Sequence, residues 1–194
     1  MSAFSKFIFK ATTGFLSFAD KYRLAYYTHL YGNQLELDNN IVFGRGSSIT
    51  IFPGGKDSKI KLSRDNTFRR NCIITLDLGG QLIIGHSNFF NNRCSMNCLG
   101  KIEIGSNNLF GENVLLYDHN HRFSNLGVPV VEQGFSVGKI KIGNNCWIGS
   151  GCIILNNVTI GDNVIIGANN LVYQSIPSDI ILKSNATGSA INRL

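Results

Sequence analysis

The chain has little charge: 15% of its 194 residues are Asp, Glu, Lys or Arg, whereas about 25% is usual in globular proteins. Glycine (21 residues) and asparagine take up the difference, and both residue types favour tight turns. With 43% hydrophobic residues the chain can still build a core, and its length fits a single domain. This composition indicates many short β segments joined by regular corners.

Two further absences concern the cell compartment. The chain has five cysteines, an odd number, and its N-terminus does not read as an export signal. We therefore expect reduced thiols and a cytoplasmic protein, with the inner face of the membrane as an alternative location. No apolar run approaches the roughly 18 residues that a membrane span needs. The net charge of +6 suits an anionic partner, but nucleic acid is not expected, because the basic residues lack aromatic interleaving on one face.

Residues 142–177 repeat with a period of six. Six consecutive repeats begin with an aliphatic residue, and glycine follows it in four of them. Neither a helix (period about 3.6) nor a hairpin (period about 2) explains this spacing, but a solenoid with three short strands in each turn does. The first and fifth residues of each repeat then point inward, and the turns stack at roughly 4.8 Å.

Earlier parts of the chain continue the repeat less regularly. Equivalent inward positions are 62, 84, 104, 142 and 160, which are 22, 20, 38 and 18 residues apart. The interval of 38 holds one ordinary turn and about 20 further residues, which predicts a loop extruded over about 119–138. The predicted organisation is an N-terminal helical cap segment (1–40), a β-helix domain (41–183) and a C-terminal tail (184–194).

Four cysteines fall on inward fifth positions of the repeat: Cys72, Cys94, Cys146 and Cys152. A small apolar thiol suits such a position, so we interpret these residues as core packing. Cys94 and Cys98 have a spacing that metal pairs also use, but no second pair matches them. No metal is expected.

Apolar residues near the N-terminus follow a helical period: Phe4, Ile8, Ala11, Phe15, Phe18 and Tyr22. A helix of this kind would cover the first coil, because an uncapped coil exposes a sheet edge. Peripheral membrane contact through residues 1–31 is the alternative interpretation.

The stretch YDHNHRF (117–123) lies at the root of the predicted loop. Histidine titrates near neutral pH, so it can take a proton from a hydroxyl group and return it to a leaving group. The same two histidines, His119 and His121, could instead form a metal clamp with His86 as a third ligand, or be surface residues. The spacing alone leaves these three interpretations open.

The sequence resembles the left-handed β-helix, hexapeptide-repeat acyltransferases over about residues 41–183. The stretch WIGSGCIILNNVTIGDNVIIGANNLV (147–172) is similar to the C-terminal coils of galactoside, maltose and capsule or lipopolysaccharide O-acetyltransferases. DHNHRF (118–123), followed by PVVEQG (129–134), is similar to the branch that modifies capsule and O-antigen. The resemblance implies a left-handed solenoid, a homotrimer, acetyl-CoA as co-substrate and a sugar hydroxyl of a surface glycan as acceptor.

The resemblance also implies roles for individual residues. His121 matches the catalytic histidine, Asn91 an asparagine that orients the acceptor, and Trp147 a tryptophan near the thioester. The positions that match the pantetheine track, together with the glycine column beside them, are Gly111, Gly149, Ser150, Gly167 and Ala168. Asp118 and His119 are expected to contact the acceptor or to orient the loop. The family's usual basic motif after the last coil is replaced by KSNATG (183–188), so Lys183 or Arg193 is expected to contact the CoA phosphates.

The coil register adds an expectation about the acceptor. Arg69 precedes Asn91 in one outward column, and the surrounding stretch is the most basic of the chain, with Lys59, Lys61, Arg64 and Arg70. An arginine there could form a bidentate pair with a carboxylate. We therefore expect an acidic acceptor, with a solvated basic rim as the alternative.

Other functions stay open at this point. Within the same fold, the chain could acetylate the amine of an amino sugar or a small molecule. A non-enzymatic β-helix scaffold would need neither His121 nor Trp147. A metal-dependent hydratase would need three convergent histidines.

Overall fold

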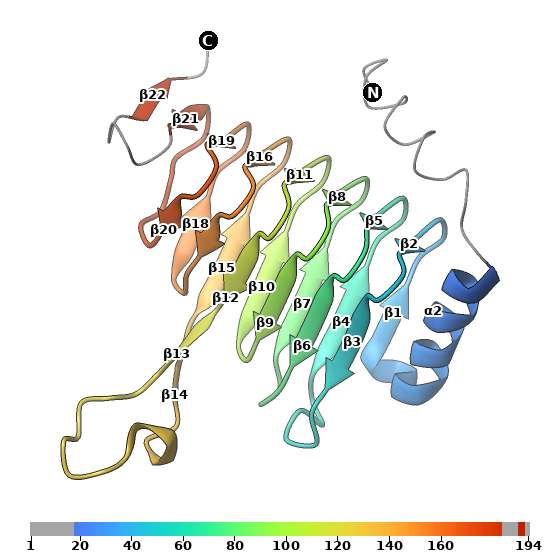
Figure 1. Cartoon of the computed structure of the whole chain (residues 1–194), viewed down its shortest axis with the longest axis horizontal. Coiled ribbons are helices and arrows are strands. Elements are labelled where there is room, and N and C mark those ends of the chain that lie inside the picture. Colours follow the sequence, from blue (N-terminus) through green and yellow to red (C-terminus); the bar gives the residue numbers. More distant parts are fainter. Residues whose placement is uncertain (1–17, 184–189, 193–194) are drawn as a thin grey trace.

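The chain winds into a solenoid with three faces, each of which is a β-sheet whose strands are parallel from coil to coil (Figure 1). This computed structural model describes residues 18–183 and 190–192. Several predictions fall outside the described residues: the helical stripe from Phe4 to Phe15, membrane contact through residues 1–17, most of the C-terminal tail, and Arg193.

Within the described residues, the three strands of one turn belong to three sheets, which we call A, B and C. Sheet A contains β1 (Leu35–Leu37), β4 (Lys59–Leu62), β7 (Gln81–Ile84), β10 (Lys101–Ile104), β15 (Lys139–Ile142) and β18 (Val158–Ile160). Sheet B contains β2 (Val42–Phe43), β5 (Thr67–Phe68), β8 (Phe89–Phe90), β11 (Leu109–Phe110), β16 (Trp147–Ile148), β19 (Ile165–Ile166), β21 (Ile180–Leu182) and the antiparallel β22 (Ala190–Asn192). Sheet C contains β3 (Ser48–Ile51), β6 (Ile73–Leu76), β9 (Ser95–Cys98), β12 (Leu115–Tyr117), β17 (Ile153–Ile154) and β20 (Leu171–Val172). The predicted all-β fold, a left-handed parallel β-helix, is confirmed.

The turns differ in length at one corner of the solenoid. Equivalent buried residues of sheets A and B are six residues apart (62 and 68, 84 and 90, 104 and 110), as are those of sheets B and C (68 and 74, 90 and 96, 110 and 116). From sheet C to sheet A the interval varies: 11 residues from Ile49 to Ile60, 8 from Ile74 to Leu82, 6 from Met96 to Ile102 and 24 from Leu116 to Ile140. All length variation among these turns therefore lies at the C–A corner.

The longest of these C–A connections is the predicted loop. It starts and ends with two antiparallel strands, β13 (His119–His121) and β14 (Phe135–Val137), and contains the 3-10 helix η2 (Val130–Glu132). Sheet A continues across it without interruption, because Ile102 on β10 pairs with Ile140 on β15. In Figure 1 this hairpin projects from the body of the solenoid. The predicted extrusion over about 119–138 is confirmed.

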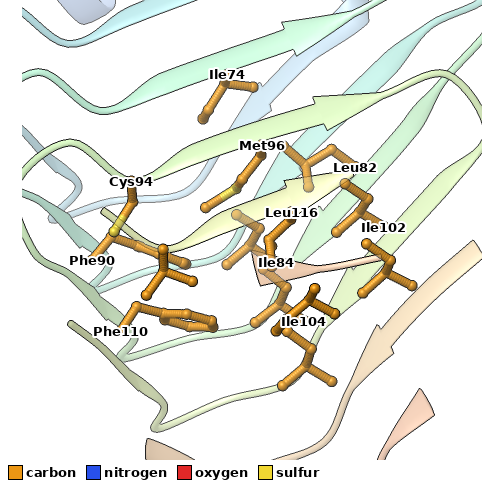
Figure 2. Packing of buried hydrophobic residues seen from close by; sticks show 14 of the residues in the cluster. Ile74, Leu82, Ile84, Phe90, Cys94, Met96, Ile102, Ile104, Phe110 and Leu116 are labelled. Carbon is orange, nitrogen blue, oxygen red and sulfur yellow. The ribbon is translucent and has the colours of Figure 1, made fainter. Parts of the chain in front are cut away.

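The core fills the inside of the solenoid with one layer of side chains per turn. Phe43, Phe68, Phe90 and Phe110 form a ladder behind sheet B, with successive ring centroids 5.6, 4.6 and 4.5 Å apart. Figure 2 shows Phe90 and Phe110 together with the aliphatic residues of the other two sheets. Cys72, Cys94, Cys146 and Cys152 are buried as predicted, and so is Cys98.

Asparagine is abundant because the corners need left-handed backbone. Positive φ angles between 51° and 64° recur at non-glycine corner residues, and eight of these residues are asparagines: Asn40, Asn71, Asn107, Asn113, Asn145, Asn157, Asn163 and Asn169. Asparagine tolerates this conformation better than other residues that carry a Cβ. The corners therefore account for the unusual composition.

Helix α2 (Phe18–Tyr31), followed by the 3-10 helix η1 (Gly32–Gln34), lies against the first coil (Figure 1). The Tyr27 ring packs edge-on against Phe43, with centroids 6.1 Å apart. The Tyr31 hydroxyl donates to Ile49 O and accepts from Ile51 N–H, both at 3.1 Å. These contacts cover the sheet edge of the first coil. Strand β1 already belongs to sheet A, so the solenoid begins at Leu35.

No helix in the described ranges is long and apolar enough to cross a membrane.

Candidate functional site

The root of the hairpin is held by a buried carboxylate. Asp118 is 0% exposed. Its Oδ1 accepts from Leu99 N–H at 2.9 Å and its Oδ2 from Gly100 N–H at 2.8 Å. The backbone closes the same point, because Gly138 N–H donates to Asp118 O at 2.7 Å. Asp118 therefore fixes the position where the hairpin leaves the solenoid and does not face solvent.

The two histidines of the hairpin lie on the same face of β13, because side chains alternate along a strand. His119 Nδ1 lies 3.0 Å from Asp118 Oδ1, and its side chain is 15% exposed. His121 is exposed. Both rings contact Phe135 on β14, with centroids 5.4 Å away for His119 and 4.6 Å away for His121. Among the described residues, no group forms a hydrogen bond or ion pair with the His121 imidazole. His121 is thus a positioned but accessible imidazole.

The loop beyond the histidines is ordered by its own hydrogen bonds. Gln133 Nε2 donates to Asn125 O at 2.9 Å and to Val128 O at 2.7 Å, and Gln133 Oε1 accepts from Asn125 N–H at 3.1 Å. Its tip nevertheless exposes apolar side chains, with Phe123 at 73%, Leu126 at 100% and Val131 at 81%. The hairpin therefore presents apolar surface away from the body of its own chain.

The B–C corner carries the other predicted site residues in one column. Successive backbone hydrogen bonds link its coils: Arg69 N–H donates to Phe90 O, Asn91 N–H to Phe110 O, Gly111 N–H to Ile148 O and Gly149 N–H to Ile166 O. The column therefore reads 69, 91, 111, 149 and 167, which is the order that the coil register predicts. The next column along the corner reads Arg70, Asn92, Glu112, Ser150 and Ala168.

The glycines of this column are required by the stacking of the coils. A Cβ at Gly111 would lie 2.5 Å from Ser150 N, and one at Gly149 would lie 2.5 Å from Ala168 N. Gly111 and Gly167 are half-buried and Gly149 is buried, so the absence of side chains in this column serves mainly the close stacking of the coils.

Two residues that frame this corner are exposed. Trp147 lies on the outer face of sheet B, between Leu109 and Ile165 of the neighbouring coils, and is 54% exposed. Lys183 is exposed immediately after β21. The corner thus combines a column of glycines with an exposed indole and, at its C-terminal end, a basic residue.

Within one chain, the two groups of predicted residues stay apart. The histidines lie on the connection from sheet C to sheet A, whereas Asn91, Gly111 and Ser150 lie on the connections from sheet B to sheet C. His86 lies at the A–B corner, where its Nδ1 is 3.3 Å from Ser87 Oγ. In the described part of the chain, no three His, Cys, Asp or Glu side chains gather as a metal-holding group.

The outer faces of the solenoid differ in polarity. Sheet A presents mainly charged side chains, among them Glu36, Lys61, Glu103 and Lys141. Sheets B and C present large apolar side chains that are 39% to 65% exposed: Leu109, Trp147, Ile73, Leu171 and Tyr173. Leu109, Trp147 and Ile165 are neighbours on successive strands of sheet B, so their side chains form an apolar row on that face.

Sequence reasoning located the histidines but missed their surroundings. Phe135 was not singled out, although it pairs directly with His121 across the hairpin. The alternation of Phe135, Ser136 and Val137 was the available signal for β14. The basic residues near Arg69 also separate: Lys59 and Lys61 lie on the outer face of sheet A, and Arg64 lies at the A–B corner beside Asp65.

Residues 139–174 match the family described as bacterial transferase hexapeptide (six repeats). The chain is similar in structure to AntD, an N-acyltransferase from Bacillus cereus in complex with dTDP and 3-hydroxybutyryl-CoA, with a TM-score of 0.64, 21% identity and 87% of each chain covered. It is also similar to the hexapeptide-repeat acetyltransferase VCA0836 from Vibrio cholerae, with a TM-score of 0.56, 20% identity, and 98% of this chain and 88% of that chain covered. The polySia-specific acetyltransferase NeuO has a TM-score of 0.53 and 17% identity, with 82% of this chain and 74% of that chain covered. The chain therefore carries the bacterial transferase hexapeptide repeat and shares the left-handed β-helix of these hexapeptide-repeat acyltransferases, as the resemblance of its sequence predicts.

Proposed function

We propose that the chain is an acetyl-CoA-dependent O-acetyltransferase that acts on a sugar hydroxyl of a surface glycan during polysaccharide biosynthesis. The observation that carries the proposal is the exposed His121 imidazole, fixed on a hairpin whose root is held by buried Asp118. Further support comes from proteins of the same fold, since an AntD structure holds 3-hydroxybutyryl-CoA and a VCA0836 structure holds acetyl-CoA.

His121 acts as the general base. A sugar hydroxyl is too weak an acid to attack a thioester unaided, so its proton passes to the imidazole while its oxygen bonds to the thioester carbonyl carbon. The carbon–sulfur bond then breaks, and the proton passes from His121 to the CoA sulfur. No covalent bond to the protein forms. Proton transfer of this kind supplies roughly 10² to 10⁴ in rate.

The B–C corner is our proposed acyl-CoA track. Acyl-CoA supplies the activated acyl group, and its pantetheine arm suits the edge beside Gly111 and Gly167, which are half-buried and carry no side chain. Ser150 and Ala168 flank it, and the Trp147 indole N–H is a donor for the oxyanion that develops on the thioester. Lys183, exposed at the end of the column, is available to the CoA phosphates.

We further propose that each site forms between two copies of the chain in a homotrimer. Three observations support this arrangement: the histidines and the B–C corner are apart in one chain, sheets B and C present apolar outer faces, and the hairpin tip exposes Leu126 completely. Head-to-tail contacts between unlike surfaces close into a ring when the rotation allows it.

The test is acetyl transfer by His121→Ala. We expect a loss of at least about 10² in turnover, because a general base contributes roughly 10² to 10⁴. His119→Ala should lose clearly less, and His86→Ala, the matched control at the A–B corner, should be unaffected. Sedimentation should give the same trimer for all variants. Equal losses at 119 and 121, with sensitivity to a chelator, would contradict the base assignment.

The acceptor panel should contain neutral, acidic and amino sugars. An alkali-labile acetyl ester in the product identifies O-acetylation, and an alkali-stable amide would refute it in favour of N-acetylation. Mixed trimers of His121→Ala and Trp147→Ala should regain activity, because some interfaces then combine an intact histidine with an intact tryptophan. No recovery on mixing would contradict a shared site.

A further inference from the structure

Arginine is concentrated at the N-terminal end of the B–C corner. Three successive coils contribute Arg45, Arg69, Arg70 and Arg93, all of which are exposed. Backbone hydrogen bonds define their stacking: Asn71 N–H donates to Arg45 O at 3.0 Å, and Arg93 N–H donates to Arg70 O at 2.9 Å. Because coils are roughly 4.8 Å apart, this arginine corner extends over about 10 Å of one edge.

The arginine corner has little internal neutralisation. Among the described residues, the guanidinium groups of Arg45 and Arg70 have no hydrogen bond or ion pair. Arg69 Nη1 donates only to the amide Oδ1 of Asn91, at 3.3 Å. Arg93 donates to Asn113 Oδ1 at 2.8 Å and lies 3.8 Å from Glu112, the one carboxylate that contacts these arginines in the described ranges. Exposed guanidinium groups without carboxylate partners form a site for an external anion.

Arg93 differs in residue type from the rest of its column. Arg93 has a φ of 61°, and the equivalent corner residues of the other coils are Gly46, Asn71, Asn113, Gly151 and Asn169, all with positive φ. Glycine and asparagine accept this conformation readily, whereas it is unfavourable for other residues with a Cβ. Arg93 therefore adds a cationic side chain at a corner position where the other coils have glycine or asparagine.

We propose that the arginine corner binds the carboxylate groups of an acidic glycan and thereby brings the hydroxyl to be acylated to Asn91. The inference rests on the proposed function for its second half. Arg69 contacts Asn91 directly, and Asn91 adjoins Gly111 in the same column, so the bound anion and the acyl-CoA track share one edge. The Asn91 amide Oδ1 is already occupied by Arg69 and by Asn92 N–H, which reserves its amide N–H for the sugar.

Binding should be measured without acetyl-CoA, by calorimetric titration of the full-length protein. The probes are oligosialic acid and oligogalacturonic acid, each beside its carboxyl-reduced, neutral counterpart. We expect at least one acidic oligomer to bind about tenfold or more tightly than its reduced form, as charge-assisted hydrogen bonds imply. This preference should weaken as salt rises. If neither acidic oligomer binds more tightly than its reduced form, the proposal is wrong.

Two variants test the arginines without endangering the fold. Arg69→Gln/Arg70→Gln should weaken acidic-oligomer binding about tenfold to hundredfold, because two charged donors are lost. Arg93→Asn should weaken it as well, yet melt at or above the wild-type temperature, because asparagine suits positive φ. Lys139→Gln/Lys141→Gln removes the same charge from sheet A and should change neither. If this control variant loses as much binding to acidic oligomers as the arginine variants, the effect is due to net charge and the proposed arginine site is wrong.

Further results distinguish acidic-glycan binding from the binding of other anions, and distinguish this inference from the proposed function. Tighter, arginine-dependent binding of single-stranded DNA or of phosphatidylglycerol vesicles than of either acidic oligomer would overturn the glycan assignment. Acid-selective binding by a protein that acetylates no acceptor in the panel would refute the proposed function and leave the anion site standing. Acetyl transfer with no preference for acidic acceptors would support the proposed function and refute the acidic-glycan inference.

Discussion

The substitution Asp118→Asn tests whether the buried carboxylate holds the hairpin that carries the histidines. Asparagine has nearly the same shape, but one of its two terminal atoms donates hydrogen bonds. Asp118 accepts from two backbone N–H groups at 2.9 and 2.8 Å and is 0% exposed. In the variant, either Leu99 N–H or Gly100 N–H therefore faces another donor in a buried position.

The expected destabilisation follows from these contacts. A hydrogen bond to a charged group contributes about 1.5–3 kcal/mol, and a buried N–H without a partner costs about 1–3 kcal/mol. Because the two figures overlap in what they count, we expect the free energy of unfolding to fall by about 2–4 kcal/mol. Urea unfolding followed by circular dichroism measures this change, and Asp57→Asn, at an exposed turn, is the control.

The kinetic readout distinguishes a positioning role from stability alone. At a temperature where Asp118→Asn is fully folded, kcat should fall while the KM for acetyl-CoA stays near the wild-type value, because the B–C corner is untouched. A variant that is destabilised but keeps full kcat would refute the positioning role. A variant as stable as the wild type would refute the account of the hairpin root itself.

Buried side chains give three other predictions. Buried Asn88 donates to Gly85 O and Gly105 O and accepts from Asn108 N–H, all at 2.9 Å. Asn88→Ala should therefore lower the free energy of unfolding by about 3 kcal/mol, at about one per hydrogen bond. A shift of the urea midpoint no larger than that of Asn39→Ala, at an exposed residue without positive φ, would contradict this. All five cysteines are buried, so a thiol reagent at pH 8 should modify none of them in the native protein and all of them in guanidinium, and rapid native labelling would show the packing to be wrong. Burial and then the Asp118 carboxylate raise the pKa of Cys98 above its ordinary value of 9.0, so its contribution to stability should be complete below about pH 9 and decline at higher pH, where the unfolded chain binds fewer protons. An alkaline titration that shows no such decline relative to Cys98→Ala would refute the shift.

The solenoid was predictable because its signal is local and repeated. A buried aliphatic residue every sixth position identified the coils from Ile142 onward, and the interval of 38 residues between Ile104 and Ile142 identified the hairpin. The column of Arg69, Asn91 and Gly111 followed from the same counting, since each stacked coil repeats the position of the one before.

The surroundings of the site were not predictable, because they depend on contacts that the period does not encode. The burial of Asp118 results from the backbone of Leu99 and Gly100 in the preceding coil. The clustering of Arg45 and Arg93 with Arg69 needs the turn lengths of two irregular coils, and the left-handed φ of Arg93 contradicts its residue preference. Sequence periodicity thus locates columns, whereas the chemistry of each corner depends on residues that break the repeat.

The restriction of length variation to the C–A corner has a consequence for how such a chain can change. Insertions there leave the register of all three sheets intact, because the turn before the hairpin and the turn after it pair as direct neighbours at Lys101 and Lys139. The A–B and B–C corners have no such freedom, since one added residue would move every inward side chain of that strand to the outside. New loops can therefore be grafted at the connection between Leu76 and Gln81, two coils before the histidines, without disturbing the columns of the B–C corner. The connection between Cys98 and Lys101 is unsuitable, because Leu99 and Gly100 hold Asp118. The C–A corner can therefore vary in length, whereas stacking of the coils fixes the length of the A–B and B–C corners.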